Sequence, residues 1–77
     1  MNWWYIYKAI FWDENEEVMR CDLGMIIADT YAGAMKILQE WYGEENIDSI
    51  QVKAVKEANE PYLLDQNRFD ALWEGRD

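Results

Sequence analysis

The stretch WWYIYKAIFW, residues 3–12, decides the fold of this chain. Its residues are mostly aromatic or β-branched, and for a run of this length that composition favours a strand over a helix. Because side chains alternate between the two faces of a strand, the stretch divides into two sets: Trp3, Tyr5, Tyr7, Ala9 and Phe11 on one face, and Trp4, Ile6, Lys8, Ile10 and Trp12 on the other. Both faces are largely apolar. This pattern is typical of a central strand whose sheet is covered on both sides, or on one side with a partner awaited on the other.

The residues that follow predict a hairpin and then a helix. The polar run DENEE, residues 13–17, predicts the hairpin turn, and a second strand returns over residues 18–28 with Gly24 as a bulge or kink. Asp29 or Thr30 is expected to cap the helix, and Gly43 is expected to end it. Apolar residues at three- and four-residue spacings predict a broad buried stripe on this helix: Tyr31, Ala34, Met35, Ile37, Leu38, Trp41 and Tyr42.

A third strand and a short second helix complete the chain. Alternation in NIDSIQVKAVKE, residues 46–57, predicts a half-exposed strand with Ile50, Val52 and Ala54 facing inward. Pro61 marks a break, after which Asp65 is expected to cap a two-turn helix that presents Phe69, Leu72 and Trp73 on one side and ends at Gly75.

These elements predict an α+β fold. The right-handed rule for the crossover between the second and third strands allows a three-stranded sheet of order 2-1-3, which places the doubly apolar first strand in the centre. We expect one long helix packed on one face of the sheet and a short C-terminal helix. Residues 1–77 are expected to form a single domain, because so short a chain supports one core.

Composition restricts the classes of partner. Seven Lys and Arg against sixteen Asp and Glu give a formal net charge of -9, so nucleic acid and anionic membranes would be repelled. A basic protein surface is the favoured partner, because opposite charge accelerates encounter.

The apolar N-terminal run is interrupted by Lys8 and is too short to span a bilayer, and it lacks the features of a signal peptide. The lone Cys21 allows no intrachain disulfide and points to an intracellular location.

The sequence predicts a protein that is not an enzyme and that uses no cofactor. It has no His, the commonest general base near neutral pH and the commonest metal ligand. Cys21 has no His to lower its pKa, and no glycine-rich phosphate loop is present. A calcium loop beginning at Asp13 fails because Val18 replaces the turn glycine and Gly24 replaces the bidentate Glu. No metal site is therefore expected, although an enzyme with a substrate-bound metal held by carboxylates stays as a further alternative.

The acidic residues gather in three clusters. The first two provide candidate partner-binding residues: Asp13, Glu14, Glu16 and Glu17 in one, and Glu44, Glu45 and Asp48, near Glu40, in the other. The third runs along Glu57, Glu60, Asp65, Asp70, Glu74 and Asp77. Carboxylates two apart on a strand lie roughly 6.6 Å from each other, so rows of them can imitate a nucleic-acid backbone. The alternative is that the acids only keep an aromatic-rich domain in solution.

Five Trp, five Tyr and two Phe are more rings than three strands and a helix can easily bury. Tyr31, Trp41 and Tyr42 are expected in the core. Some of the remaining rings are expected to form an exposed patch: Trp3, Tyr5, Tyr7, Tyr62 and Trp73. Of these, Trp3, Tyr5 and Trp73 are the candidate partner-binding residues, since exposed Trp and Tyr commonly carry binding energy. Such a patch would serve either a homodimer or a basic protein partner.

The segment IIADTYAGAMKILQEWYGEENIDSIQV, residues 26–52, resembles small phage-encoded acidic proteins of strand, strand, helix, strand type. The residues that carry the likeness are Ala28, Thr30, Tyr31, Ala32, Ala34, Tyr42, Gly43, Ile47, Ser49 and Ile50, while Trp41 departs from the Tyr of that pattern. The resemblance implies a phage or mobile-element origin and inhibition of a host defence system such as a CRISPR effector, a restriction enzyme or a nucleotide-signalling system. It assigns no functional residue.

Together these observations predict a phage-type acidic inhibitor, anti-CRISPR-like or a DNA mimic. It would act in the host cytoplasm by docking on a basic nucleic-acid-binding surface of a bacterial defence protein. The alternative is a homo-oligomeric small-ligand sponge or structural module, in which the spare sheet face pairs subunits and a pocket forms between them.

Overall fold

The computed structural model describes residues 1–75 and confirms the predicted α+β fold. The elements follow one another as β1 (Trp3–Asp13), β2 (Val18–Ala28), α1 (Tyr31–Tyr42), the 3-10 turn η1 (Glu44–Asn46), β3 (Ile47–Glu57) and α2 (Gln66–Trp73). The strands form an antiparallel sheet in the order β2-β1-β3, so the doubly apolar first strand is central, as predicted. At 12 residues, α1 is a helix of ordinary length, shorter than the long helix expected.

The two outer strands pair with β1 differently. β1 and β2 stay in register from Trp3 opposite Ala28 to Asp13 opposite Val18. The β1–β3 pairing shifts register between Trp4 and Tyr5 and again between Ile10 and Phe11. The bulge expected at Gly24 is therefore absent from the β1–β2 pairing. Gly24 instead makes room for the ring opposite it, because a Cβ there would lie 2.5 Å from the Tyr7 hydroxyl.

One face of the sheet packs against α1. Thr30 caps this helix, because its Oγ1 accepts a hydrogen bond from the Gly33 N–H at 2.9 Å. Ala34 and Leu38 are buried on its inner side, and Ala34 packs in a cluster with Tyr5 and Ala28. Gly43 ends the helix with a φ of 84°, in the region that favours glycine.

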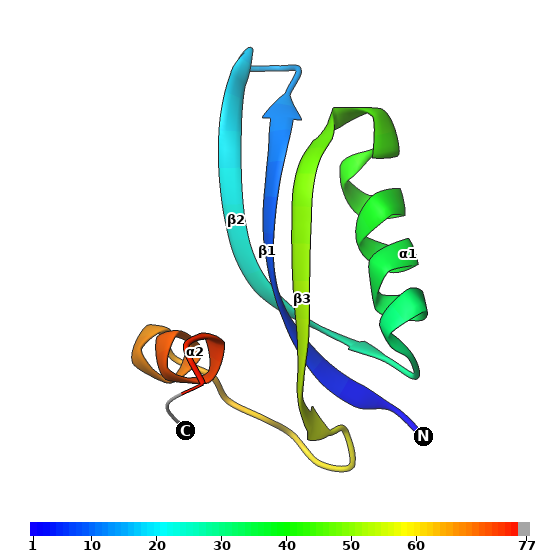
Figure 1. The fold of residues 1–77 in the computed structure, drawn as a ribbon, viewed down its shortest axis with the longest axis vertical. Helices are drawn as coiled ribbons and strands as arrows, with labels where there is room; N and C mark the ends of the chain where they lie inside the picture. The colour runs from blue at the N-terminus through cyan, green and yellow to red at the C-terminus, as the bar shows by residue number, and fades with distance from the viewer. Residues whose placement is uncertain (76–77) are drawn as a thin grey trace.

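The buried stripe predicted for α1 is narrower than expected. Tyr31, Ile37 and Trp41 are exposed, and Trp41 keeps 77% of its surface. The reason is the position of the helix, because α1 lies alongside β3 (Figure 1). The residues that point most directly at the sheet are then Ala34, Leu38 and Tyr42, which are spaced four apart. Ala54 on β3, expected to face inward, is also exposed.

The opposite face of the sheet is covered over only part of its length by α2. Asp65 caps this helix by accepting a hydrogen bond from the Arg68 N–H at 2.8 Å. Phe69 is buried and stacks on Trp73 with 5.9 Å between ring centroids. On the same sheet face Ile6 is 0% exposed. Further along that face four apolar side chains stay exposed: Ile10, Trp12, Met19 and Leu23.

Two valine substitutions on β1 test this division of the face. Ile6→Val should lower the free energy of unfolding by about 1 kcal/mol, because it removes a methylene from a filled site. Ile10→Val makes the same chemical change on the same strand and face, but at a side chain that is 38% exposed, and should cost less than about 0.5 kcal/mol. Urea unfolding measures both. Equal losses would show that α2 does not divide the face as described.

Candidate binding surface

The β1–β2 turn is an ordered acidic tip. Asp13 organises it: its Oδ1 accepts from the backbone N–H of Asn15 at 3.0 Å and of Glu16 at 3.2 Å. Its Oδ2 accepts from Arg20 Nε at 2.6 Å. The Arg20 hydrogen bond, followed by the Glu16 N–H, holds the pKa of Asp13 below its ordinary value. Asp13 is thus engaged within the turn, while the exposed carboxylates on the tip are Glu14, Glu16 and Glu17.

The second acidic cluster follows the end of α1. Gly43 turns the chain into η1, which begins with Glu44 and Glu45, and β3 then carries Asp48 near its start. These three carboxylates are all exposed. They form one flank of the same end of the molecule as the acidic tip, because β1 ends, β2 begins, α1 ends and β3 begins there (Figure 1).

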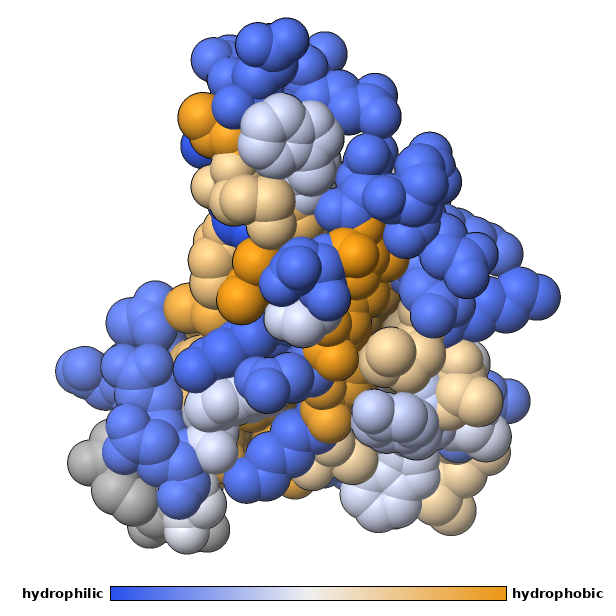
Figure 2. Space-filling view, turned by 45° about the horizontal axis from the view of Figure 1, so that its top comes forward, coloured by the Kyte–Doolittle hydropathy of each residue, from blue (hydrophilic) through white to orange (hydrophobic). Residues whose placement is uncertain are grey.

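The structure therefore brings the first two predicted clusters together. Between them lies an open groove of about 450 Å³. Its walls come from the end of β1, the tip, β2, the end of α1 and η1: Phe11, Trp12, Asp13, Glu14, Asn15, Asp22, Trp41, Tyr42 and Asn46. Figure 2 shows hydrophilic residues at the top and upper right of the molecule, with hydrophobic residues exposed between them. We call this region the acidic end. It comprises the groove and the seven carboxylates of the first two clusters: Asp13, Glu14, Glu16, Glu17, Glu44, Glu45 and Asp48.

Tyr42 ties the helix to the sheet beneath the acidic end. Its hydroxyl donates to Asp22 Oδ2 at 2.9 Å and lies 3.2 Å from the hydroxyl of Tyr7. Its ring packs against Phe11, with 4.6 Å between centroids. Burial raises the pKa of the Tyr42 phenol well above its ordinary value, and the hydrogen bonds with Tyr7 and Asp22 raise it further. At neutral pH the phenol is thus a fixed hydrogen-bond donor.

Asp77 of the third acidic cluster lies outside the described residues. The rest of this cluster lies at the other end of the molecule and is largely engaged within the fold. Glu60 Oε1 accepts from Lys56 Nζ at 3.0 Å, Asp65 caps α2, and Asp70 Oδ1 accepts from Gln66 Nε2 at 3.0 Å. Lys8 and Lys53 also lie near α2, where Lys53 Nζ donates to the carbonyl oxygen of Leu72 at 2.6 Å. Lys8, Lys53 and Lys56 therefore lie near the carboxylates of this third cluster.

The aromatic residues predicted to bind a partner are not at the acidic end. Tyr5 is only 5% exposed and belongs to the core, so the exposed patch expected there does not include it. Trp3 is 37% exposed at the start of β1, and Trp73 lies on α2 with the Lys8 ammonium 4.9 Å from its ring centroid. The structure leaves these three residues apart from the first two acidic clusters.

Two other tryptophans occupy the acidic end. Trp41 is 77% exposed and Trp12 is 41% exposed, and both line the groove between the acid clusters. The sequence contained no signal for the exposure of Trp41. It stands three residues after the buried Leu38 and seven after the buried Ala34, which is the spacing of a core residue.

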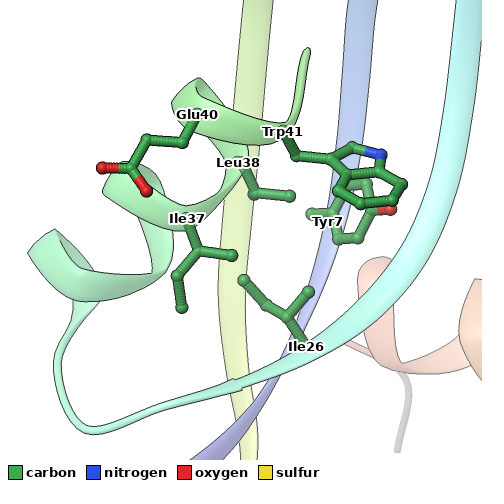
Figure 3. Close-up of a pocket in the computed structure, with 6 residues that line it drawn as sticks. All are labelled: Tyr7, Ile26, Ile37, Leu38, Glu40 and Trp41. Atoms are coloured by element: carbon green, nitrogen blue, oxygen red, sulfur yellow. The ribbon is translucent and has the colours of Figure 1, made fainter. Parts of the chain in front are cut away.

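A second groove, of about 430 Å³, lies between α1 and β2 (Figure 3). It is mostly apolar and is lined by Tyr7, Ile26, Ile37, Leu38, Glu40 and Trp41. Trp41 belongs to both grooves, since it stands where α1 approaches β1 and β2. The two grooves make a continuous surface of aromatic, aliphatic and carboxylate groups, which is suited to binding.

Comparison with known proteins finds no protein-family model, no curated protein and no solved structure that matches this chain. Within residues 1–75, neither α1 nor α2 combines the length and the apolar composition needed to cross a bilayer. The same residues contain no group of three or more His, Cys, Asp or Glu side chains arranged to hold a metal ion.

Replacing Tyr42 tests whether its hydrogen bonds hold α1 on the sheet. Tyr42→Phe should lower the free energy of unfolding by about 1–2 kcal/mol, because Asp22 loses its donor in a partly buried site. Tyr31→Phe on the same helix is the matched control and should change it by less than about 0.5 kcal/mol, since Tyr31 is 56% exposed. Urea unfolding of both variants is the measurement, and equal effects would contradict the assignment.

Proposed function

We propose that this protein is a phage-type acidic inhibitor that binds a bacterial defence protein in the host cytoplasm. In this proposal the acidic end docks on a basic nucleic-acid-binding surface, as an anti-CRISPR-like protein or DNA mimic would. The observation that carries the proposal is the convergence of two acid clusters around Trp12 and Trp41 at one end of the molecule.

Charge supports this class of partner. The net charge is -9, and Arg20, whose Nε bonds to Asp13, is the basic residue on β2 near the tip. A strongly negative surface attracts a cationic groove over a range set by the Debye length, and it repels nucleic acid itself. The protein therefore competes with nucleic acid for the same site on the partner, and it binds no nucleic acid directly.

In this proposal the exposed tryptophans provide the binding affinity that surface charge alone does not provide. Rim charges mainly accelerate encounter, whereas large rings buried at the centre of an interface commonly provide most of its affinity. Trp41 and Trp12 line the groove together with Asp13, Glu14 and Asp22, so exposed aromatic rings adjoin a charged rim. Binding by these groups needs no chemical step, so the proposed activity is non-enzymatic and requires no cofactor.

The groove between α1 and β2 favours a second candidate function. Its apolar lining and volume of about 430 Å³ fall within the range of small-molecule sites. In this alternative the protein sequesters a small ligand as a homo-oligomeric sponge or structural module. Ligand capture would then survive charge reversal at Glu44, Glu45 and Asp48, which distinguishes it from the acidic inhibitor.

Charge reversal tests the electrostatic part of the proposal. Immobilised protein is incubated with nuclease-treated bacterial lysate, and retained proteins are identified by mass spectrometry and eluted with salt. Reversing Glu44, Glu45 and Asp48 to Lys should reduce capture of a nucleic-acid-binding protein at least about tenfold and flatten its salt dependence. The matched control changes the net charge equally at the other end, with Asp29, Glu60 and Glu74 replaced by Lys. Equal losses, or capture of no such protein, would contradict docking through the acidic end.

Replacing Trp41 tests the aromatic part. Trp41→Ala should weaken binding to the captured partner by about 2 kcal/mol or more while changing the free energy of unfolding by less than about 0.5 kcal/mol, because the ring is exposed. Tyr31→Ala is the control, as it removes an exposed ring from the other end of the same helix. Calorimetric titration and urea unfolding give the two quantities. Unchanged affinity in Trp41→Ala would show that the ring is not part of the interface.

A further inference from the structure

The outer edge of β2 is an unprotected sheet edge. Within residues 1–75, β2 pairs with β1 alone, and it does so without a bulge. The other edge strand, β3, has the features that discourage edge pairing: two register irregularities, and lysines at Lys53 and Lys56. The first half of β2 has no register shift and no lysine, its one cation Arg20 is bonded to Asp13, and its residues from Val18 to Cys21 are exposed. This edge is therefore the one open to another strand.

We propose that β2 pairs antiparallel with β2 of a second copy of this chain, with Cys21 at the twofold axis. The resulting ladder joins Val18–Gly24 of the two copies into one six-stranded sheet. This inference concerns the outer edge of β2, which adjoins the acidic end at Arg20 and Asp22, and it does not depend on the proposed function.

Charge complementarity fixes the register. Arg20 and Asp22 both lie on the sheet face that packs against α1, because they pair with Phe11 and Ala9 of β1. In a ladder centred on Cys21, Arg20 of each copy stands directly opposite Asp22 of the other. Opposite side chains in such a ladder have Cβ atoms roughly 5 Å apart. Arg20 bonds Asp13 through Nε and Asp22 accepts from Tyr42 at Oδ2, so the two ion pairs across the axis use the Nη groups of Arg20 and Oδ1 of Asp22. A ladder centred on Arg20 or on Asp22 would instead put like charges opposite each other.

The opposite sheet face is complementary as well. There the same register places Met19 of one copy opposite Leu23 of the other. Leu23 borders a hollow of about 180 Å³ between β2 and α2, which Gly24, Met25, Leu64 and Phe69 also line. Met19 is 50% exposed, and its flexible side chain is suited to filling an irregular gap. Pairing therefore covers two exposed apolar side chains on each copy.

The antiparallel arrangement also keeps the acidic ends apart. The two tips point in opposite directions, and each lies about six residues from Cys21. At about 3.4 Å per residue they are roughly 40 Å from one another. This distance exceeds the Debye length of about 8 Å at physiological ionic strength several-fold, so repulsion between the two tips is screened.

Complementary charge variants test the proposal. Sedimentation equilibrium of the unmodified chain should show reversible dimers between about 10 µM and 1 mM. Arg20→Glu alone and Asp22→Arg alone each place like charges opposite one another and should weaken the dimer at least about tenfold. An equimolar mixture restores both ion pairs in the heterodimer and should return the dissociation constant to within about threefold of the unmodified value. Folding effects of either change cannot produce this rescue.

Disulfide formation reports the register independently. Diamide oxidises two thiols to a disulfide while being reduced to the hydrazine, and Cys21 of the two copies should couple rapidly because the residues are opposite at the axis. Val18→Cys in a Cys21→Ser background is the control, since residue 18 faces residue 24 in this register. A strict monomer at 1 mM, a mixture that stays monomeric, or equal coupling of the two thiols would overturn the proposal.

Discussion

The constraint on which the structure depends is that β1 has apolar side chains on both faces. A strand of this kind must be central and must have cover on both sides, since a bare apolar face costs free energy in water. Here α1 covers one face and α2 covers part of the other, while β2 and β3 flank the strand. Because neither helix covers a whole face, the sheet keeps apolar surface at Ile10, Trp12 and the groove beside Ile26.

The acidic end follows from how α1 is attached. Tyr42 is anchored to Asp22 and packs on Phe11, so the end of the helix is held near the β1–β2 turn. The acid cluster that begins at Glu44 is therefore fixed beside the acidic tip, although the two clusters are far apart in the sequence. A few buried contacts thus turn a charge excess into a localised negative surface with two exposed tryptophans.

The spacing of apolar and polar residues was enough to predict the elements and the cap at Asp65, because these depend on local sequence. The strand order could be predicted because the two apolar faces of β1 require a central position in the sheet. It was not enough to predict burial on a partly covered sheet. Trp41 has the spacing of a core residue, but the position of α1 beside β3 leaves it exposed. Tyr5 was expected at the surface and lies in the core, since Ala28 and Ala34 leave room for its ring. Gly24 leaves room for the Tyr7 ring opposite it on β1. This role depends on how two strands pair, so the local sequence around Gly24 could not predict it.

The most direct test of the account is competition between this protein and nucleic acid on the partner recovered from bacterial lysate. Labelled duplex DNA and labelled RNA would each be bound to the purified partner, and the protein would be titrated in while fluorescence anisotropy is followed. The account predicts that the protein releases the nucleic acid, and that the inhibition constant from this competition equals the directly measured dissociation constant of the protein for the partner. Both constants should increase with salt concentration. A ternary complex in which the nucleic acid stays bound would contradict docking on the nucleic-acid-binding surface.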